Sequence, residues 1–268
     1  MILIARPATL CRILPERLLV ILLEDTQVIR QLDYEPIRIH LRVSSRAEAG
    51  VRLRSCAKEP DTIRWIESFK ADEVFFDIGA NVGAYSLVAS LGHAGIVPVY
   101  AFEPSAPTFA RLCENLTLNH CQDVVPLSMA LSDHTGLERF NYSSLSPGNA
   151  LHTLGMPFDY KNERFEPVAR IFTLTFKLDD LIELFKLPTP THLKIDVDGL
   201  ELAIIRGAWA TIRDSRVKSI LVEVREDSRE SQQIIRLVND AGLTYAGRHP
   251  YLDKPSLGIA NYLFIRNP

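Results

Sequence analysis

Two groups of acidic residues in this chain could bind or activate a small polar ligand. The first begins at Asp77, which interrupts an apolar run over residues 74–78. A turn follows that contains three residues expected to contact a cofactor: Gly79, Asn81 and Gly83. Glycine allows positive φ angles and close approach of a ligand, and the apolar residues 84–91 predict a helix whose N-terminus faces the turn. The pattern predicts a nucleotide-type site at the carboxyl end of a first parallel strand.

Asp77 helps to select the class of ligand. A dinucleotide fingerprint reads G-x-G-x-x-G, with the pyrophosphate on the helix N-terminus, but here Asn81 takes the place of the middle glycine. A carboxylate two residues before the first glycine repels a pyrophosphate and attracts an ammonium or sulfonium group. The turn therefore favours an amino-acid-bearing nucleoside such as S-adenosyl-L-methionine, with an NAD-dependent oxidoreductase as the alternative.

Further candidate cofactor residues follow the next two predicted strands. Glu103 ends the strand predicted over residues 97–103 and stands 20 residues after Gly83. An acid at about this spacing accepts hydrogen bonds from ribose hydroxyls in nucleotide-binding folds. The strand predicted over residues 124–128 leads to a turn at the same edge of the sheet. Three residues of that turn are placed to flank an adenine: Leu131, Ser132 and Asp133.

The second acidic group lies in residues 192–201, around Lys194, Asp196 and Asp198. Burying unpaired charge is costly, so a strand packed on both faces rarely carries three charges for structure alone. We expect Asp196 or Asp198 to orient or deprotonate an acceptor, with Lys194 and Glu201 steadying the loop. An ion pair of purely structural role is the alternative for Lys194.

A divalent ion held by Asp196, Asp198 and Glu223 is a further alternative, because oxygen-rich sites suit Mg²⁺ or Ca²⁺. A site without a metal is the preferred interpretation. Acceptor binding is expected to involve Asn149 and His152, together with Glu201. The first two lie in residues 141–171, an irregular stretch able to line a sugar-sized pocket, although a plain surface loop is also consistent with it.

These groups need a scaffold that brings strand ends together. From residue 73 onward the predicted strands and helices alternate, which is typical of a doubly wound, mostly parallel α/β sheet. Strands predicted over residues 243–248 and 261–265 suit an antiparallel C-terminal end. We expect two units: an N-terminal extension over residues 1–58 and a catalytic domain over residues 59–268.

The extension is predicted to contain a helix and a β-hairpin. Residues 18–23 form an apolar run too short to cross a bilayer, which needs about 20 residues. This run is expected to dock on the domain as a helix or to form part of a homodimer contact. Residues 36–43 and 51–54 alternate apolar and basic positions, which predicts two paired strands. Four basic residues of these strands are expected to form a solvated face, with contact to an anionic partner as the alternative: Arg38, Arg42, Arg52 and Arg54.

Composition limits the partners. The chain has 268 residues and a formal net charge of −3, which gives no general preference for nucleic acid or an anionic membrane. Its four cysteines include no C-x-x-C pair, so reduced thiols and a cytoplasmic location are expected.

Taken together, the motifs resemble the FkbM-like family of S-adenosylmethionine-dependent methyltransferases. In chain order they are FDIGANVG (76–83), FEP (102–104), ALSD (130–133), LDD (178–180) and KIDVDGLE (194–201). One departure is that the family often has Glu where this chain has Asp198. The resemblance implies a class I methyltransferase fold with a Rossmann-like sheet. It also implies O-methylation of a hydroxyl on a sugar, polyketide or other secondary metabolite, so the acceptor is expected to be a small molecule or a glycan.

A third interpretation keeps the nucleoside site but removes the chemistry. In it the chain is a non-catalytic nucleoside-binding or scaffold protein, with residues 1–58 as its interaction surface. The charges over residues 194–201 disfavour it, because charged residues clustered in a cleft tend to mark functional sites.

Overall fold

The computed structural model describes residues 15–18, 28–158, 163–250 and 258–267. Its centre is a seven-stranded sheet. In chain order the strands are β3 (Phe75–Ile78), β4 (Val99–Phe102), β5 (Val124–Leu127), β10 (His192–Ile195), β11 (Ser219–Arg225), β12 (Thr244–Pro250) and β13 (Ile259–Ile265). Their spatial order is β12-β13-β11-β10-β3-β4-β5, and β13 runs antiparallel to both neighbours. This confirms the predicted mostly parallel, class I sheet with its antiparallel C-terminal strand.

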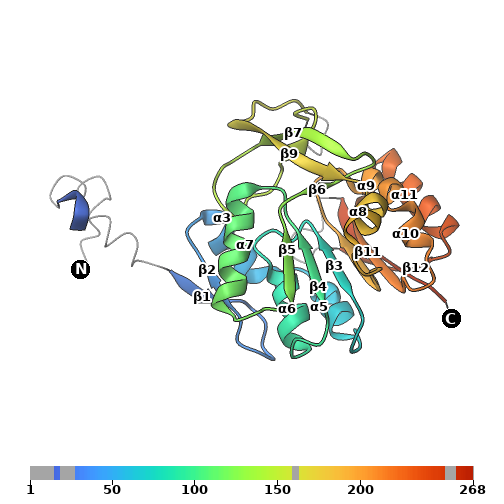
Figure 1. Ribbon diagram of the computed structural model, residues 1–268, viewed down its shortest axis with the longest axis horizontal. Helices are drawn as coiled ribbons and strands as arrows, with labels where there is room; N and C mark the ends of the chain where they lie inside the picture. The colour runs from blue at the N-terminus through green and yellow to red at the C-terminus, as the bar shows by residue number, and fades with distance from the viewer. Residues whose placement is uncertain (1–14, 19–27, 159–162, 251–257, 268) are drawn as a thin grey trace.

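Helices cover both faces of this sheet (Figure 1). One face packs against α5 (Pro60–Glu67), α6 (Ala84–Gly92) and α7 (Ala106–Leu118). The other packs against α8 (Leu178–Phe185), α9 (Glu201–Gly207), α10 (Trp209–Arg213) and α11 (Arg229–Asp240). Successive strand residues point to opposite faces, so Phe75 joins the first core and Phe76 the second. Burial on both faces explains why the strands read as nearly continuous apolar runs.

A second, four-stranded sheet stands at the carboxyl edge of the first (Figure 1). It consists of β6 (Ala130–Leu131), β7 (Gly136–Tyr142), β8 (Thr153–Leu154) and β9 (Ala169–Phe176), in the order β6-β9-β7-β8. The prediction that residues 141–171 are irregular is therefore wrong for β8 and for the ends of β7 and β9. The pattern failed because β8 has only two residues and because the adjacent apolar residues Ile171 and Phe172 of β9 are both exposed, so the usual polar–apolar alternation is absent.

The N-terminal hairpin exists, but its strands differ from those predicted. β1 (Ile29–Gln31) pairs antiparallel with β2 (His40–Arg42), whereas residues 51–54 form the 3-10 helix η1 (Arg52–Arg54). The free edge of β2 is taken by α7, where Asn119 and Asn115 accept hydrogen bonds from the backbone N–H groups of His40 and Arg42. A strand at residues 51–54 would have no edge to join.

The extension also shares the core of the main sheet. Leu32, Ile39 and Leu41 are buried in the same cluster as residues of α5 and α6. The division at residue 58 therefore stays a prediction. The helix or dimer contact predicted for residues 18–23 lies outside the described residues, apart from Leu18.

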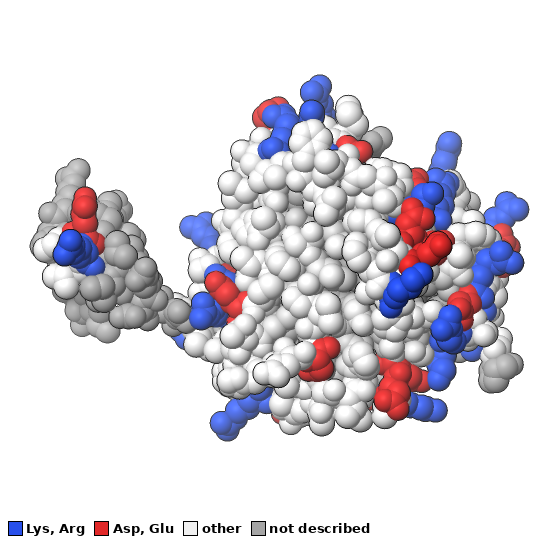
Figure 2. Space-filling model, viewed as in Figure 1, with Lys and Arg blue, Asp and Glu red and all other residues white. Residues whose placement is uncertain are grey.

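The apolar content of the helices and the charges on the surface bear on whether the chain has what a membrane span or a charged partner would need. Along the described ranges, no helix has both the length and the apolar content needed to cross a membrane. On the face in Figure 2, Lys, Arg, Asp and Glu lie mainly around the rim, and the centre over β5 carries none. Both signs of charge are interspersed on that rim, so this face presents no large field of one sign.

A close backbone contact gives a test of the packing at the carboxyl edge. A Cβ added to Gly207 in α9 would meet the backbone oxygen of Ser132 at 1.9 Å. Gly207→Ala must therefore push α9 away from the residues that follow β6. We expect it to lower the free energy of unfolding by about 1–3 kcal/mol, measured by urea denaturation.

The matched control is Gly136→Ala, because a Cβ there meets nothing within 4 Å. A Gly207→Ala variant as stable as the Gly136→Ala variant would contradict this packing.

Candidate active site

The turn after β3 brings two strands and a loop together. Gly79 has φ +85°, and a Cβ at this position would meet the backbone oxygen of Asp196 at 1.9 Å. Only glycine lets the turn lie this close to the end of β10. Asn81 also has a left-handed backbone, φ +51°, and donates from its side chain to the Asn149 oxygen at 3.1 Å. Strained non-glycine residues of this kind tend to cluster at functional sites.

Glu103 lies beside this turn at the end of β4. Its Oε2 accepts a hydrogen bond from the Asn81 N–H at 3.0 Å, and its Oε1 accepts one from the Ser105 N–H at 2.8 Å. Burial raises the pKa of Glu103 to about 7, despite these two bonds. The carboxyl borders a small hollow whose other members include Pro104, Met129, Leu131, Phe140 and His152.

The predicted cofactor residues divide into two sets. Gly79, Asn81, Glu103 and Leu131 line the hollow. The other four do not line it: Asp77, Gly83, Ser132 and Asp133.

Three of these four have other contacts. Gly83 is the N-cap of α6, and the Ser132 N–H donates to the Phe176 oxygen. Asp133 is exposed, with its Oδ1 3.2 Å from the His134 ring. Their roles in binding stay predictions.

Asp77 lies behind the turn, inside β3. It is 0% exposed, and its Oδ2 accepts a hydrogen bond from the Ser86 hydroxyl at 2.6 Å. Its Oδ1 has no hydrogen-bond partner among the described residues. Burial raises the pKa of Asp77, and the nearby Lys194 ammonium partly opposes that rise. Asp77 is the register partner of Lys194 on β10, and its role in cofactor binding stays a prediction.

Lys194 is a buried ammonium at the centre of the acidic residues. It is 1% exposed and donates to Asp196 Oδ2 at 2.6 Å, with Nζ 4.7 Å from the ring centroid of Tyr85. Burial would lower the pKa of Lys194, but Asp196, Glu59 and Asp77 raise it. Burial would likewise raise the pKa of Asp196, and Lys194 instead holds it well below its usual range. Asp196 is therefore a fixed negative charge.

Asp198 and Glu201 behave differently. Asp198 has φ +52°, and its Oδ2 accepts a hydrogen bond from the Leu151 N–H at 2.6 Å. Glu201 Oε1 accepts from the N–H groups of Val197 and Gly199, at 3.3 and 3.2 Å. Burial raises the pKa of Asp198 to about 6 and that of Glu201 to about 7. Both carboxyls therefore titrate close to neutrality.

These groups open onto a cleft of about 1310 Å³. Its sheet-side wall includes Gly79, Asn81, Asn149, Asp196, Asp198, Glu201 and Glu223. Of the predicted acceptor residues, Asn149 and Glu201 line this cleft, whereas His152 lines the hollow at Glu103. The His152 Nδ1 accepts from the Ser143 N–H at 3.2 Å, and burial lowers the pKa of His152 to about 4, so its ring is neutral.

The basic wall of the cleft was not predicted from the sequence. It includes Arg52, Arg54 and Lys58. The period-two spacing of the two arginines predicts a solvated strand face, with an anionic partner as the alternative. Apolar and basic residues do alternate here, but Arg52–Arg54 form a 3-10 helix and not a strand. In such a helix residues two apart do not share a face, so the alternation does not produce a basic strand face.

The cleft fits a cation on its sheet side. Asp196, Asp198 and Glu201 line the cleft and Glu103 lines the adjoining hollow. All four are buried or half-buried, and three of them have raised pKa values. Burial raises these pKa values, and a positively charged ligand beside the carboxyls would stabilise their ionised forms. In the described part of the chain no three His, Cys, Asp or Glu residues could hold a metal ion, and this includes the carboxylates of the divalent-ion hypothesis. Glu223 instead forms a side-chain hydrogen bond with Asp196.

Comparison with known proteins gives one family. The model of the methyltransferase FkbM domain matches residues 77–245. A hexuronic acid methyltransferase, AglP of Haloferax volcanii, is 28% identical over 194 residues, which is 72% of this chain and 73% of that protein. The 31-O-demethyl-FK506 methyltransferase FkbM of Streptomyces tacrolimicus is 28% identical over 195 residues, 64% of this chain and 73% of that protein.

Among solved structures, an FkbM methyltransferase from Methylobacillus flagellatus matches with a TM-score of 0.49 at 16% identity. The match covers 72% of this chain and 43% of the other. This chain thus spans less than half the length of that protein.

The raised pKa of Glu201 predicts a pH-dependent effect of substitution. The pKa rises from 4.5 to about 7 on folding, so ionisation of Glu201 opposes folding. Its contribution to stability is full below its unfolded pKa and is lost as the pH rises through about 7. Glu201→Gln keeps an acceptor oxygen and removes the charge. Relative to wild type, the variant should gain about 1–3 kcal/mol between about pH 5 and pH 8.5, measured by urea denaturation.

The control is Glu183→Gln, the same exchange at an exposed position of α8. If the Glu201→Gln difference stays constant across this pH range, Glu201 ionises normally in the folded protein.

Proposed function

The chain belongs to the FkbM family of methyltransferases, and from this premise we propose that it is an S-adenosyl-L-methionine-dependent O-methyltransferase. Its acceptor is a hydroxyl on a sugar, polyketide or other secondary metabolite. The observation that carries the proposal is that Asp196 and Asp198 line both the cleft and the adjoining hollow, to which Glu201 and Glu103 respectively add a third carboxyl. Negative potential in a poorly solvated cleft suits the sulfonium and ammonium groups of this cofactor.

The relatives support oxygen as the acceptor atom. One is named for a hexuronic acid, which offers hydroxyl and carboxyl oxygens, and the other for a 31-O-demethyl compound.

We further propose that the methyltransferase domain spans residues 59–268, with residues 1–58 as an extension.

We propose a place in the site for each end of the cofactor. The turn at Gly79 and Asn81, with the fixed charge of Asp196, would hold the amino-acid end. Glu103 would accept hydrogen bonds from the ribose, and the hollow at Leu131 would take the adenine. When bound, the cofactor supplies a methyl group already activated by the sulfonium, so the protein mainly has to position the acceptor and remove its proton.

Asp198 is the residue that we propose for proton removal. With a pKa of about 6 it is largely ionised at neutral pH yet basic enough to accept a proton from a hydroxyl in the transition state. Asp196 is a weaker base because Lys194 stabilises its ionised form. The hydroxyl proton therefore ends on Asp198, and Lys194 is a positioning residue that never touches the acceptor.

The NAD-dependent alternative has no supporting contact. The Asn81 N–H, which a pyrophosphate would need, donates to Glu103 Oε2. A pyrophosphate in this turn would also lie close to the carboxylates of Glu103 and Asp196, which repel it.

The cofactor assignment is tested by Glu103→Gln, which keeps one acceptor oxygen and removes the charge. Charged hydrogen bonds contribute about 1.5–3 kcal/mol, so affinity for S-adenosylmethionine should fall roughly 10–100-fold by titration calorimetry. Glu183→Gln should bind as the wild type does. Unchanged affinity in a folded Glu103→Gln variant would remove Glu103 from the ribose site.

The base assignment is tested by Asp198→Asn. Transfer of labelled methyl to a panel of sugar and polyketide alcohols should fall about 10²–10⁴-fold, with cofactor affinity kept within a few-fold. In the wild type, the rate should fall as the pH drops below the Asp198 pKa of about 6. Full turnover by Asp198→Asn would show that another group accepts the proton.

A further inference from the structure

The basic wall of the cleft carries guanidinium groups with few protein partners. The wall is formed by η1 and the short helices on either side of it, α3 (Arg46–Gly50) and α4 (Ser55–Lys58). In the described part of the chain the Arg54 side chain makes no hydrogen bond or ion pair. The Arg52 side chain uses only its Nε, which donates to the Gly148 oxygen at 2.8 Å. Lys58 differs, because its ammonium lies 3.1 Å from Glu59. Two arginine forks are thus available to a ligand.

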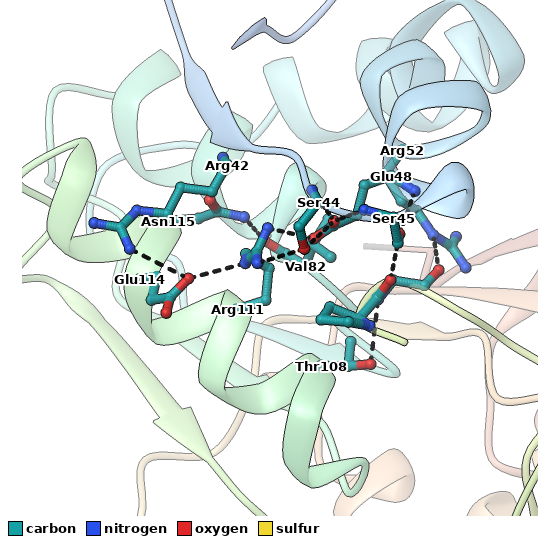
Figure 3. Close-up of polar contacts among 12 residues, drawn as sticks. Arg42, Ser44, Ser45, Glu48, Arg52, Val82, Thr108, Arg111, Glu114 and Asn115 are labelled. Carbon is teal, nitrogen blue, oxygen red and sulfur yellow. Dashed lines mark hydrogen bonds and ion pairs between the residues drawn. The ribbon is translucent and has the colours of Figure 1, made fainter. Parts of the chain in front are cut away.

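A buried network holds this wall in place (Figure 3). Ser45 and Glu48 form a capping box at the start of α3, in which each side chain bonds the backbone N–H of the other. Glu48 is 1% exposed and pairs with Arg111 of α7 at 2.7 Å. A polar contact this well enclosed fixes the direction in which η1 leaves α3.

The start of α3 also contacts the loop between β7 and β8, which carries Asn149 and His152. The Ser45 hydroxyl donates to the Pro147 oxygen at 2.7 Å. Gly148 has φ +77°, and a Cβ there would meet the Glu48 Cγ at 2.8 Å, so the loop packs directly on α3. Arg52 is therefore held between the N-terminal segment and the loop rather than free in solvent.

Apolar side chains also line the cleft. Val51, Leu151 and Phe158 are exposed to solvent, and all three line the cleft. Such side chains give a surface for the carbon skeleton of a ring. The lining of the cleft thus combines carboxylates, apolar side chains and arginines.

We propose that Arg52 and Arg54 form an anion subsite, so that the acceptor carries a carboxylate or a phosphate in addition to the hydroxyl that is methylated. The planar guanidinium fork pairs with either group through two parallel hydrogen bonds. Repulsion from Asp196 and Glu201 keeps the anionic end away from the sheet. The hydroxyl end then faces Asp198, and the acceptor has one orientation in the cleft. This inference rests on the proposed methyl transfer.

The test uses Arg54→Gln, because Arg54 is exposed and its side chain makes no hydrogen bond or ion pair with the described residues. Three probes are compared: methyl glucuronoside, glucose 6-phosphate and the neutral methyl glucoside. Loss of a charged hydrogen-bonded pair should raise KM for the anionic probes roughly 10–100-fold. Arg54→Lys should lose less, and KM for the neutral probe and the Kd for S-adenosylmethionine should stay within about twofold. Preference of the wild type for the uronate or for the phosphate identifies the source of the anion.

Arg236→Gln on α11 is the matched control, since its side chain is 84% exposed and lies outside the cleft lining. Probe binding is also followed by saturation-transfer NMR in the presence of S-adenosylhomocysteine. Anionic probes that bind the wild type but not Arg54→Gln support the subsite even if no methyl is transferred. The subsite is overturned if the wild type uses or binds neutral and anionic probes equally. It is also overturned if KM and binding of the anionic probes are unchanged in Arg54→Gln. Either result leaves the proposed methyl transfer intact.

Discussion

The site depends on the buried ammonium of Lys194. Three carboxylates, Asp77, Asp196 and Glu59, come from different elements and share this one cation. Removing one partner of a buried ion pair typically costs about 3–5 kcal/mol, because the remaining charge stays unsolvated. Lys194 therefore fixes the position of β3, which carries Asp77, relative to the loop after β10, which carries Asp196. The turn that contacts the ligand is built on this relation.

The same cation separates the roles of two acids that look equivalent in the sequence. Asp196 bonds to Lys194 and stays ionised, whereas Asp198 lies two residues further on, beyond the reach of that bond. Its partner is a backbone N–H, that of Leu151, and burial raises its pKa to about 6. One carboxylate thus supplies a permanent charge and the other an exchangeable proton site. Environments that push neighbouring pKa values apart are a common basis for acid–base chemistry.

The sequence predicted what local patterns encode. The buried strands appear as apolar runs, and Glu103, Asp196 and Asp198 stand where those runs end, so the sheet and its acidic edge could be inferred. Asp77 also stands near the end of an apolar run, but it belongs to β3, and the pairing of β3 with β10 and β4 buries it. The basic wall could not be inferred, because it depends on the pairing of Glu48 with Arg111, which lies 63 residues later. The small sheet depends in the same way on the distant pairing of β7 with β9.

The loop between β7 and β8 contacts both halves of the cleft. Its Asn149 oxygen accepts from Asn81 in the cofactor turn, and its Leu151 N–H donates to Asp198 on the acceptor side. Its Gly148 also bonds to Arg52 of the basic wall. A shift of this one loop would alter the affinity for both substrates together. Thermodynamic linkage then requires reciprocity: whatever factor the methyl donor imposes on acceptor affinity, the acceptor imposes on donor affinity.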